Sequence, residues 1–269
     1  MSLYRFFELV PGILAWTTLI LMFVLSRFIP AYVAIFIILF DVYWLLKSVS
    51  FSLHLRSTFS TMKEYLKIDW LEKLKSLDAS PGPSRPLADW QELYHLIILP
   101  MYNEPYEIVR ESFATLAKSN YPKDKFIVVL ATEERAGETG QEIAKKISAE
   151  FGASFFRFLV TSHPGNLPNE LAGKGSNETW AGKVAKELII DPLKLPYEKI
   201  LVSVFDVDTQ VLPNYFARLT YAYLSEPDRD QASYQPIPLF TNNIFEASAL
   251  ARVIAFSSTF WHMMNQSRP

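Results

Sequence analysis

Polar and acidic side chains follow three short apolar runs in this sequence, and these side chains are the ones best suited to chemistry. They are Tyr102, Asn103 and Glu104 after the first run, Glu133 after the second, and Asp206 and Asp208 after the last. Only Val207 separates the two aspartates, so both carboxylates can bind the same divalent cation. Carboxylates together with phosphate oxygens are ligands that Mg²⁺ or Mn²⁺ accepts. The alternative is a pair of solvated carboxylates in a turn, which the apolar run VSVF directly before Asp206 makes less favourable.

A fourth polar segment, Ala172–Asn177, stands before an expected helix and contains Lys174. A lysine at a helix N-terminus suits a phosphate group. The segment is not a Walker loop, because Pro168 occupies the position of that loop's first glycine. The sequence also lacks a Gly-x-Ser-x-Gly elbow and a His-Glu-x-x-His motif, and its histidines are too scattered to suggest a metal site. Asn177-Glu-Thr179 matches the glycosylation pattern, but we interpret Asn177 as a residue of the helix start.

These residues need a scaffold that brings them together, and the remaining pattern predicts a doubly wound, mostly parallel α/β sheet. Strands are expected at Tyr94–Leu99, Lys125–Ala131, Ser154–Val160 and Lys199–Phe205, and helices at Ile108–Lys118, Gln141–Phe151, Asn177–Ile190 and Pro213–Leu224. Ligands of such sheets bind beyond the carboxyl ends of the strands. We therefore expect the three acidic clusters to lie at one edge of the sheet.

Two apolar segments precede this domain. Leu9–Leu25 has no charged residue, and Phe28–Leu46 has Asp41 as its only charge. Each is close to the roughly 20 apolar residues that a membrane-spanning helix needs, so we expect a transmembrane hairpin over 1–56. A cleaved signal peptide and a helical hairpin buried in a soluble core are the alternatives. Because basic residues flank the hairpin and its turn holds only Arg27, both flanks are expected in the cytoplasm.

Composition narrows the possible functions. The chain has 269 residues and no cysteine, which excludes a disulfide-stapled fold, a cysteine-ligated zinc site and a thiol nucleophile. Its net charge of −2 argues against nucleic-acid binding, which requires a basic surface. Residues 57–92 are expected to form an amphipathic helix and a proline-rich linker, because a run of Pro, Gly and Ser occupies 79–86.

Four motifs occur in order and together resemble a known family. They are Pro100-Met-Tyr-Asn-Glu-Pro105, Glu133, Gly173-Lys-Gly-Ser-Asn177 and Phe205-Asp-Val-Asp208. Over about 94–245, the sequence resembles the membrane-bound, processive-type family 2 glycosyltransferases, such as cellulose and hyaluronan synthases. The resemblance implies a GT-A sheet that binds a nucleotide sugar, with a UDP-sugar as the expected donor.

The resemblance also implies roles for individual residues. Tyr102, Asn103 and Glu104 would contact the nucleoside, and Glu133 would stand for the carboxylate that recognises the base. Lys174 would neutralise the diphosphate, while Asp206 and Asp208 would hold the metal that bridges it. A divalent cation and a lysine stabilise the charge that develops on a departing nucleoside diphosphate.

The sequence departs from the family pattern at two places. Thr132-Glu133-Glu134 replaces an Asp-rich motif after the second strand. The family's Thr-Glu-Asp-like motif, which supplies the general base, and its Gln-x-x-Arg-Trp-like motif do not occur after Asp208. We therefore expect a chain truncated at its C-terminal end, with the general base beyond Pro269. Glu246 is expected to begin a helix.

The aromatic-rich segment Gln235–Met264 is expected to contain a largely buried helix. It would serve either as core packing that the part of the chain beyond Pro269 completes, or as an element at the acceptor side or the membrane surface. Residues 93–269 would then form the GT-A domain.

The sequence thus predicts a membrane-anchored, inverting, metal-dependent glycosyltransferase, with a glycan or lipid-linked acceptor and the lipid bilayer as partners. We expect it in a bacterial inner or plasma membrane with its catalytic domain in the cytoplasm. The alternative is a membrane-anchored scaffold or assembly subunit with a degenerate fold that binds no donor. Binding of nucleic acid is not expected.

Overall fold

The structure is a computed structural model that describes residues 3–77, 90–168, 170–171, 173–241 and 244–266. The chain divides into two compact units. One comprises Met1–Leu66 and Ile237–Pro269, and the other comprises Lys67–Pro236. Each unit is described by itself, beginning with the second, which contains the sheet.

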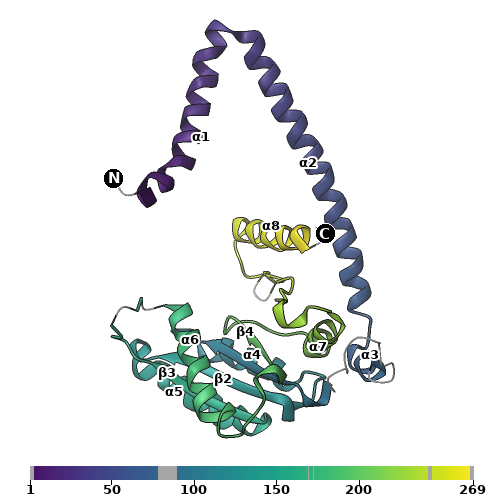
Figure 1. Cartoon of the computed structure of the whole chain (residues 1–269). Helices are drawn as coiled ribbons and strands as arrows, with labels where there is room; N and C mark the ends of the chain where they lie inside the picture. The colour runs from purple at the N-terminus through teal and green to yellow at the C-terminus, as the bar shows by residue number, and fades with distance from the viewer. Residues whose placement is uncertain (1–2, 78–89, 169, 172, 242–243, 267–269) are drawn as a thin grey trace. The chain divides into compact units, whose positions relative to one another are not determined.

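In the sheet unit, the described residues form four parallel strands in the order β3-β2-β1-β4 (Figure 1). They are β1 (Tyr94–Pro100), β2 (Phe126–Glu133), β3 (Arg157–His163) and β4 (Ile200–Val204). The chain adds β2 and β3 on one side of β1 and then crosses to place β4 on the other side. The strand order therefore reverses between β1 and β4, which is where open parallel sheets bind their ligands.

Helices cover both faces of this sheet. The helices α4 (Tyr106–Ala117), α5 (Gly137–Phe151) and α7 (Tyr215–Ser225) pack on one face, and α6 (Lys174–Ala185) packs on the other. A π-turn over Lys186–Ile190 continues α6. The short helix α3 (Trp70–Leu77) packs against α7. Single 3₁₀ turns lie at Trp90–Glu92, Lys123–Lys125, Glu134–Ala136, Gly152–Ser154, Tyr197–Lys199 and Arg229–Gln231.

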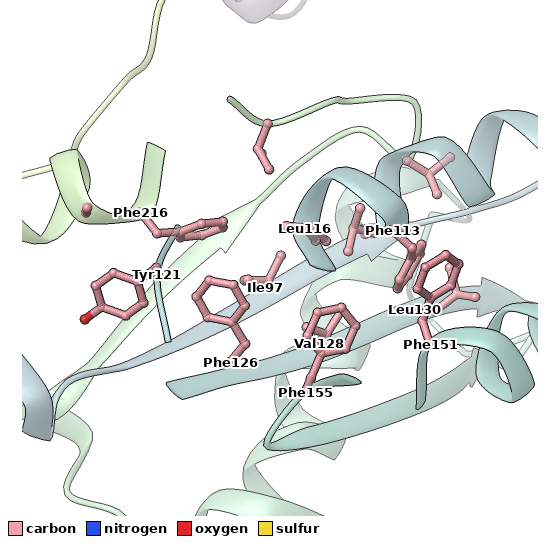
Figure 2. Close-up of a cluster of buried hydrophobic side chains, with 14 of the residues drawn as sticks. Ile97, Phe113, Leu116, Tyr121, Phe126, Val128, Leu130, Phe151, Phe155 and Phe216 are labelled. Atoms are coloured by element: carbon pink, nitrogen blue, oxygen red, sulfur yellow. The ribbon is translucent and has the colours of Figure 1, made fainter. Parts of the chain in front are cut away.

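The larger core lies between the sheet and α4, α5 and α7. Figure 2 shows Phe113, Phe126 and Phe216 packed there, and each of these side chains is fully buried. Alternate residues of each strand point to this core, because successive strand residues face opposite sides. Burial of each large aromatic side chain contributes about 2–3 kcal/mol to the stability of the unit.

The smaller core lies on the α6 side of the sheet. Leu96 and Ile98 of β1 pack there against Ala181 and Ala185. The small residues of α6 let the helix approach the sheet closely, and a side-chain carbon added at Gly182 would already touch Ile98 Cδ1 at 3.8 Å. Because both faces of the central strands are covered, β1 and β2 are buried along nearly their whole length.

The predicted α/β class and parallel sheet are confirmed. Every expected strand and helix of this unit is present, with shifts at the ends. The largest shift among the strands is in β3, which begins at Arg157 rather than Ser154 because a 3₁₀ turn occupies Gly152–Ser154. Helix α6 begins at Lys174, three residues before the expected start at Asn177.

The described residues of the other unit form three helices. They are α1 (Leu3–Phe28), α2 (Pro30–Tyr65) and α8 (Ala249–Gln266). By length and composition, α1 and α2 are apolar enough to cross a membrane, and none of their most apolar stretch is buried in the structure. This exposure does not fit the alternative of a hairpin buried in a soluble core. Pro30 begins α2, at a helix position where a missing N–H costs nothing.

Three boundaries lie elsewhere than the sequence predicts: the end of α2, the end of the sheet unit and the start of the last helix. Helix α2 runs without a break through residue 56 to Tyr65, and the compact unit with the sheet ends at Pro236 rather than 269. The expected proline-rich linker at 79–86 lies outside the described residues. Glu246 does not begin a helix, because it lies in a turn and α8 begins only at Ala249.

The expected C-terminal helix is present as α8, but the described residues leave most of its large apolar side chains exposed. Leu250, Ile254 and Trp261 of α8 are mostly exposed, and so is Phe245 in the turn before it. Composition cannot distinguish an apolar residue that faces the protein from one that faces outward, and the expectation relied on composition.

Candidate functional site

A cavity of about 210 Å³ lies where the strand order reverses. Its walls come from the segments that follow β1, β2 and β4 and from the first residue of α6. The lining residues are Pro100, Met101, Tyr102, Glu104, Glu133, Lys174, Asp206, Val207 and Asp208. All the residues singled out from the sequence line this cavity except Asn103, which is exposed beside it.

The end of β4 positions the two aspartates. Phe205 N–H donates to the carbonyl of Ile98 at 3.1 Å, so the chain stays paired with β1 up to Asp206. A turn follows, in which Thr209 N–H donates to the carbonyl of Asp206 at 2.9 Å. Val207 is buried between the two aspartates, and both aspartates are exposed. The apolar anchor therefore fixes the turn and leaves both carboxylates at the cavity.

Lys174 joins α6 to these carboxylates. It is the first residue of α6, and its ammonium donates to a carboxylate oxygen of Asp206. Glu178, one turn later in the helix, lies 3.7 Å from the same ammonium. Burial by itself lowers the pKa of Lys174, but the hydrogen bond to Asp206 and the charges of Asp206 and Glu178 outweigh it and raise that pKa. The cavity therefore contains a fixed positive charge.

Glu178 was not among the residues expected from the sequence. Its spacing of four residues after Lys174 is the signal that could have found it, since residues four apart in a helix are neighbours.

Arg135 is a second residue that the sequence did not indicate. Its guanidinium donates to the carboxylate of Glu133 and lies 4.9 Å from the centre of the Tyr102 ring. The hydrogen bond that Arg135 donates to Glu133 raises the pKa of Arg135. Glu133 is buried at the end of β2 and lines the cavity. Arg135 thus links the carboxylate after β2 to the aromatic ring after β1.

Glu104 shapes the loop after β1. Its carboxylate accepts a hydrogen bond from the backbone N–H of Tyr102 at 2.7 Å. This contact folds the loop back on itself beside the cavity, which Tyr102 lines, and Tyr102 as a whole residue is 39% exposed. Glu104 therefore acts on the loop's shape, and one face of Tyr102 stays available for a planar ligand.

A single backbone oxygen ties two walls of the cavity together. The carbonyl of Ala131 accepts from the backbone N–H of Met101 at 2.8 Å and from the side-chain amide of Asn177 at 2.8 Å. Asn177 lies in the first turn of α6 and is fully buried, in keeping with its interpretation as a helix-start residue. The loop after β1 and the N-terminus of α6 are therefore both fastened to the end of β2.

The acidic groups of the site suit a cation that shares its coordination sphere with a ligand. Within the part of the chain that the structure describes, no group of three or more His, Cys, Asp or Glu side chains could hold a metal ion. Asp206 and Asp208 would supply at most two carboxylates. Mg²⁺ is commonly bound in this way, by one or two carboxylates together with substrate phosphates and water.

The arrangement combines a carboxylate pair for a cation, an ammonium for an anion, and an aromatic ring beside a buried carboxylate. No protein-family model matches this sequence, and no curated protein shows significant similarity to it. Function must therefore be inferred from the chemistry of the site.

Proposed function

We propose that this protein is a membrane-anchored, metal-dependent, inverting glycosyltransferase with a GT-A-type sheet. It would transfer a sugar from a nucleotide sugar, with a UDP-sugar as the expected donor, to a glycan or lipid-linked acceptor. The observation that carries the proposal is the meeting of Asp206, Asp208, Lys174 and Glu133 at one cavity where the strand order reverses. These residues come from three separate segments of the chain.

The carboxylate pair and the lysine would bind the diphosphate of the donor. Asp206 and Asp208 would hold Mg²⁺ or Mn²⁺, which when bound stabilises the negative charge of the leaving diphosphate. Lys174 would bind the same phosphates from the N-terminus of α6, whose backbone N–H groups also favour an anion. For this, the lysine must exchange its present partner, Asp206, for a phosphate oxygen.

The other wall of the cavity would bind the nucleoside. The Tyr102 ring can stack on a base, and the Glu133 carboxylate can accept a hydrogen bond from a ring N–H of that base. Arg135 holds Glu133 in place and lies against Tyr102. We assign no general base among the described residues, so the acceptor side of the reaction rests on the family resemblance.

The apolar helices α1 and α2 account for the membrane anchor. Lys47 and Arg56 follow the apolar part of α2, whereas Arg27 is the one basic residue near the turn between the helices. The positive-inside rule then places the ends of the hairpin, and with them the sheet unit, on the cytoplasmic side of the membrane. This topology suits an enzyme that takes a soluble nucleotide sugar from the cytoplasm of a bacterial cell.

Calorimetry with the purified chain in detergent tests the donor site. UDP should bind in the presence of Mn²⁺, and this binding should be lost in Asp206→Asn and Asp208→Asn. Asp124→Asn is the matched control, because Asp124 is exposed at the opposite, amino end of β2 and should leave binding unchanged.

Loss of binding in all three variants would point to a general defect rather than a metal site. If the unaltered protein binds no UDP with either metal, the proposal fails. A scaffold role with a degenerate site would then be the better account.

A further inference from the structure

Helix α8 exposes its apolar side, whereas a surface helix of a soluble protein exposes its polar side. Its large apolar side chains point outward, and their exposed fractions run from 43% to 71%. The set consists of Leu250, Val253, Ile254, Phe256, Phe260 and Trp261. At 100° per residue these side chains occupy about 160° of the helix circumference. A surface helix of a soluble protein buries such a stripe and exposes the rest.

The single polar residue within that stripe is Ser257. Its hydroxyl donates to the carbonyl of Val253 at 2.7 Å, so its donor is satisfied inside the helix. A hydroxyl satisfied in this way is compatible with an apolar surrounding, where water cannot bond it. The stripe is therefore apolar in effect over its whole width.

From Ala255 onward, the opposite side of α8 faces its own unit, whereas residues 249–254 are exposed all round the helix. Thr259 is buried there, and its hydroxyl accepts a hydrogen bond from Phe240 N–H at 3.4 Å. Met263 is also buried, and its carbonyl accepts from the hydroxyl of Thr58 in α2 at 3.0 Å. Arg252, the only charged residue of α8, lies on this side as well. The polar side thus carries the protein contacts and leaves the apolar side outermost.

The contact with α2 sets the level of α8 along the hairpin. Thr58 lies 28 residues after Pro30, the first residue of α2. At 1.5 Å per residue this separation is about 42 Å, which matches the roughly 40–45 Å thickness of a bilayer with its headgroups. If the turn at Ile29 lies at one surface of the membrane, Thr58 lies at the other. Within this unit, Figure 1 shows α8 running across α2 rather than along it.

We propose that α8 lies in the membrane interface, with its apolar stripe in contact with lipid and its polar side held by α2 and the segment around Phe240. The inference rests on the membrane anchor of the proposed function. Phe256, Phe260 and Trp261 are aromatic residues of the kind that concentrate at membrane surfaces. An interfacial helix buries such a stripe at the boundary of headgroups and acyl chains. The exposed apolar side chains of α8 would then contact the same membrane as those of α1 and α2.

Spin labels can test this proposal cleanly, because the chain has no cysteine of its own. Single cysteines would be placed at Leu250 and Ile254 in the stripe, and at Ala251 and Arg252, which are exposed on the other side of the same helix. Ile37→Cys in α2 serves as the reference for lipid, and Lys145→Cys on α5 serves as the reference for water. The labelled full chain is reconstituted into phosphatidylethanolamine and phosphatidylglycerol vesicles, and accessibility to oxygen and to a water-soluble nickel chelate is measured.

The labels at Leu250 and Ile254 should have an oxygen-to-nickel accessibility ratio severalfold higher than those at Ala251 and Arg252. High nickel accessibility at Leu250 and Ile254, with Ile37 still reporting lipid, would overturn the proposal but leave the anchor standing. Low accessibility to both reagents would show that protein covers the stripe, and dipolar broadening would then identify a second copy as the cover. If Ile37 itself reports water, the anchor fails and the proposal fails with it.

Discussion

The ammonium of Lys174 binds the carboxylate of Asp206, although the two residues are 32 positions apart in the chain. The ion pair connects the first residue of α6 to the second residue after β4, at the cavity where the strand order reverses. The positively charged ammonium therefore lies against one of the two carboxylates that we propose as metal ligands. A divalent cation and Lys174 therefore compete for Asp206, and Glu178 at 3.7 Å is the second anion near the lysine.

This competition predicts opposite effects of one substitution on two ligands. Lys174→Met should raise the affinity of the protein for Mn²⁺ alone by up to about fivefold, because an exposed ion pair contributes about 0.2–1 kcal/mol. The same variant should weaken UDP binding in the presence of Mn²⁺, because the diphosphate loses its lysine. Calorimetric titrations with each ligand measure both effects. Lys183→Met, an exposed lysine later in α6, should change neither, and weaker Mn²⁺ binding by Lys174→Met would contradict the prediction.

Tyr102 should contribute to nucleoside binding through its ring and not through its hydroxyl. Tyr102→Ala should weaken UDP binding roughly tenfold or more, because stacking of a base on an aromatic side chain contributes about 1–3 kcal/mol. Tyr102→Phe keeps the ring beside Arg135 and should bind UDP as the unaltered protein does. Binding of Mn²⁺ alone should be the same in both variants. Equal UDP affinity for the Ala and Phe variants would mean that the ring does not contact the base.

His95 should make the sheet unit less stable in mild acid. Its ring is fully buried among Tyr121, Phe126 and Phe216, and this burial lowers the pKa of His95 to about 3. Between that value and the ordinary pKa near 6.5, the unfolded chain holds a proton that the folded chain excludes. The stabilising contribution is therefore complete above about pH 6.5, and it falls by about 1.4 kcal/mol for each unit of pH below that value.

Pulse proteolysis of the detergent-solubilised chain in urea, repeated between pH 7 and pH 4, measures this slope. Because carboxylates also titrate in this range, the readout is the difference between the unaltered protein and His95→Gln. The variant keeps a polar group that can reach Thr220, whose hydroxyl lies 3.0 Å from the ring nitrogen Nε2 of His95. Parallel pH profiles of the two proteins would rule out His95 as the acid-sensitive group.

The strands and the location of the site could be predicted from the sequence because each depends on local pattern. The apolar runs at β1, β2 and β4 are long enough to be buried strands, and parallel strands bring their carboxyl ends to one edge. These are consequences of a period of two residues and of the parallel order.

Partners within the site could not be predicted in the same way. Arg135 lies only two residues after Glu133, and a contact between them requires the 3₁₀ turn at Glu134–Ala136, which no pattern in the sequence marks. The exposure of the apolar side of α8 was missed for a different reason. A helix that buries its apolar stripe and one that exposes it have the same periodicity, and only the contacts of Thr259 and Met263 show which side faces the protein.

The carbonyl of Ala131 holds both the loop that presents Tyr102 and the helix that begins with Lys174. A ligand with an aromatic end and an anionic end would therefore meet two contacts that are both held by one backbone oxygen near the end of β2. Such a site selects ligands by their length. It favours ligands whose two ends are separated by the distance between the ring and the ammonium, and the fold has already paid the entropy of holding those groups apart.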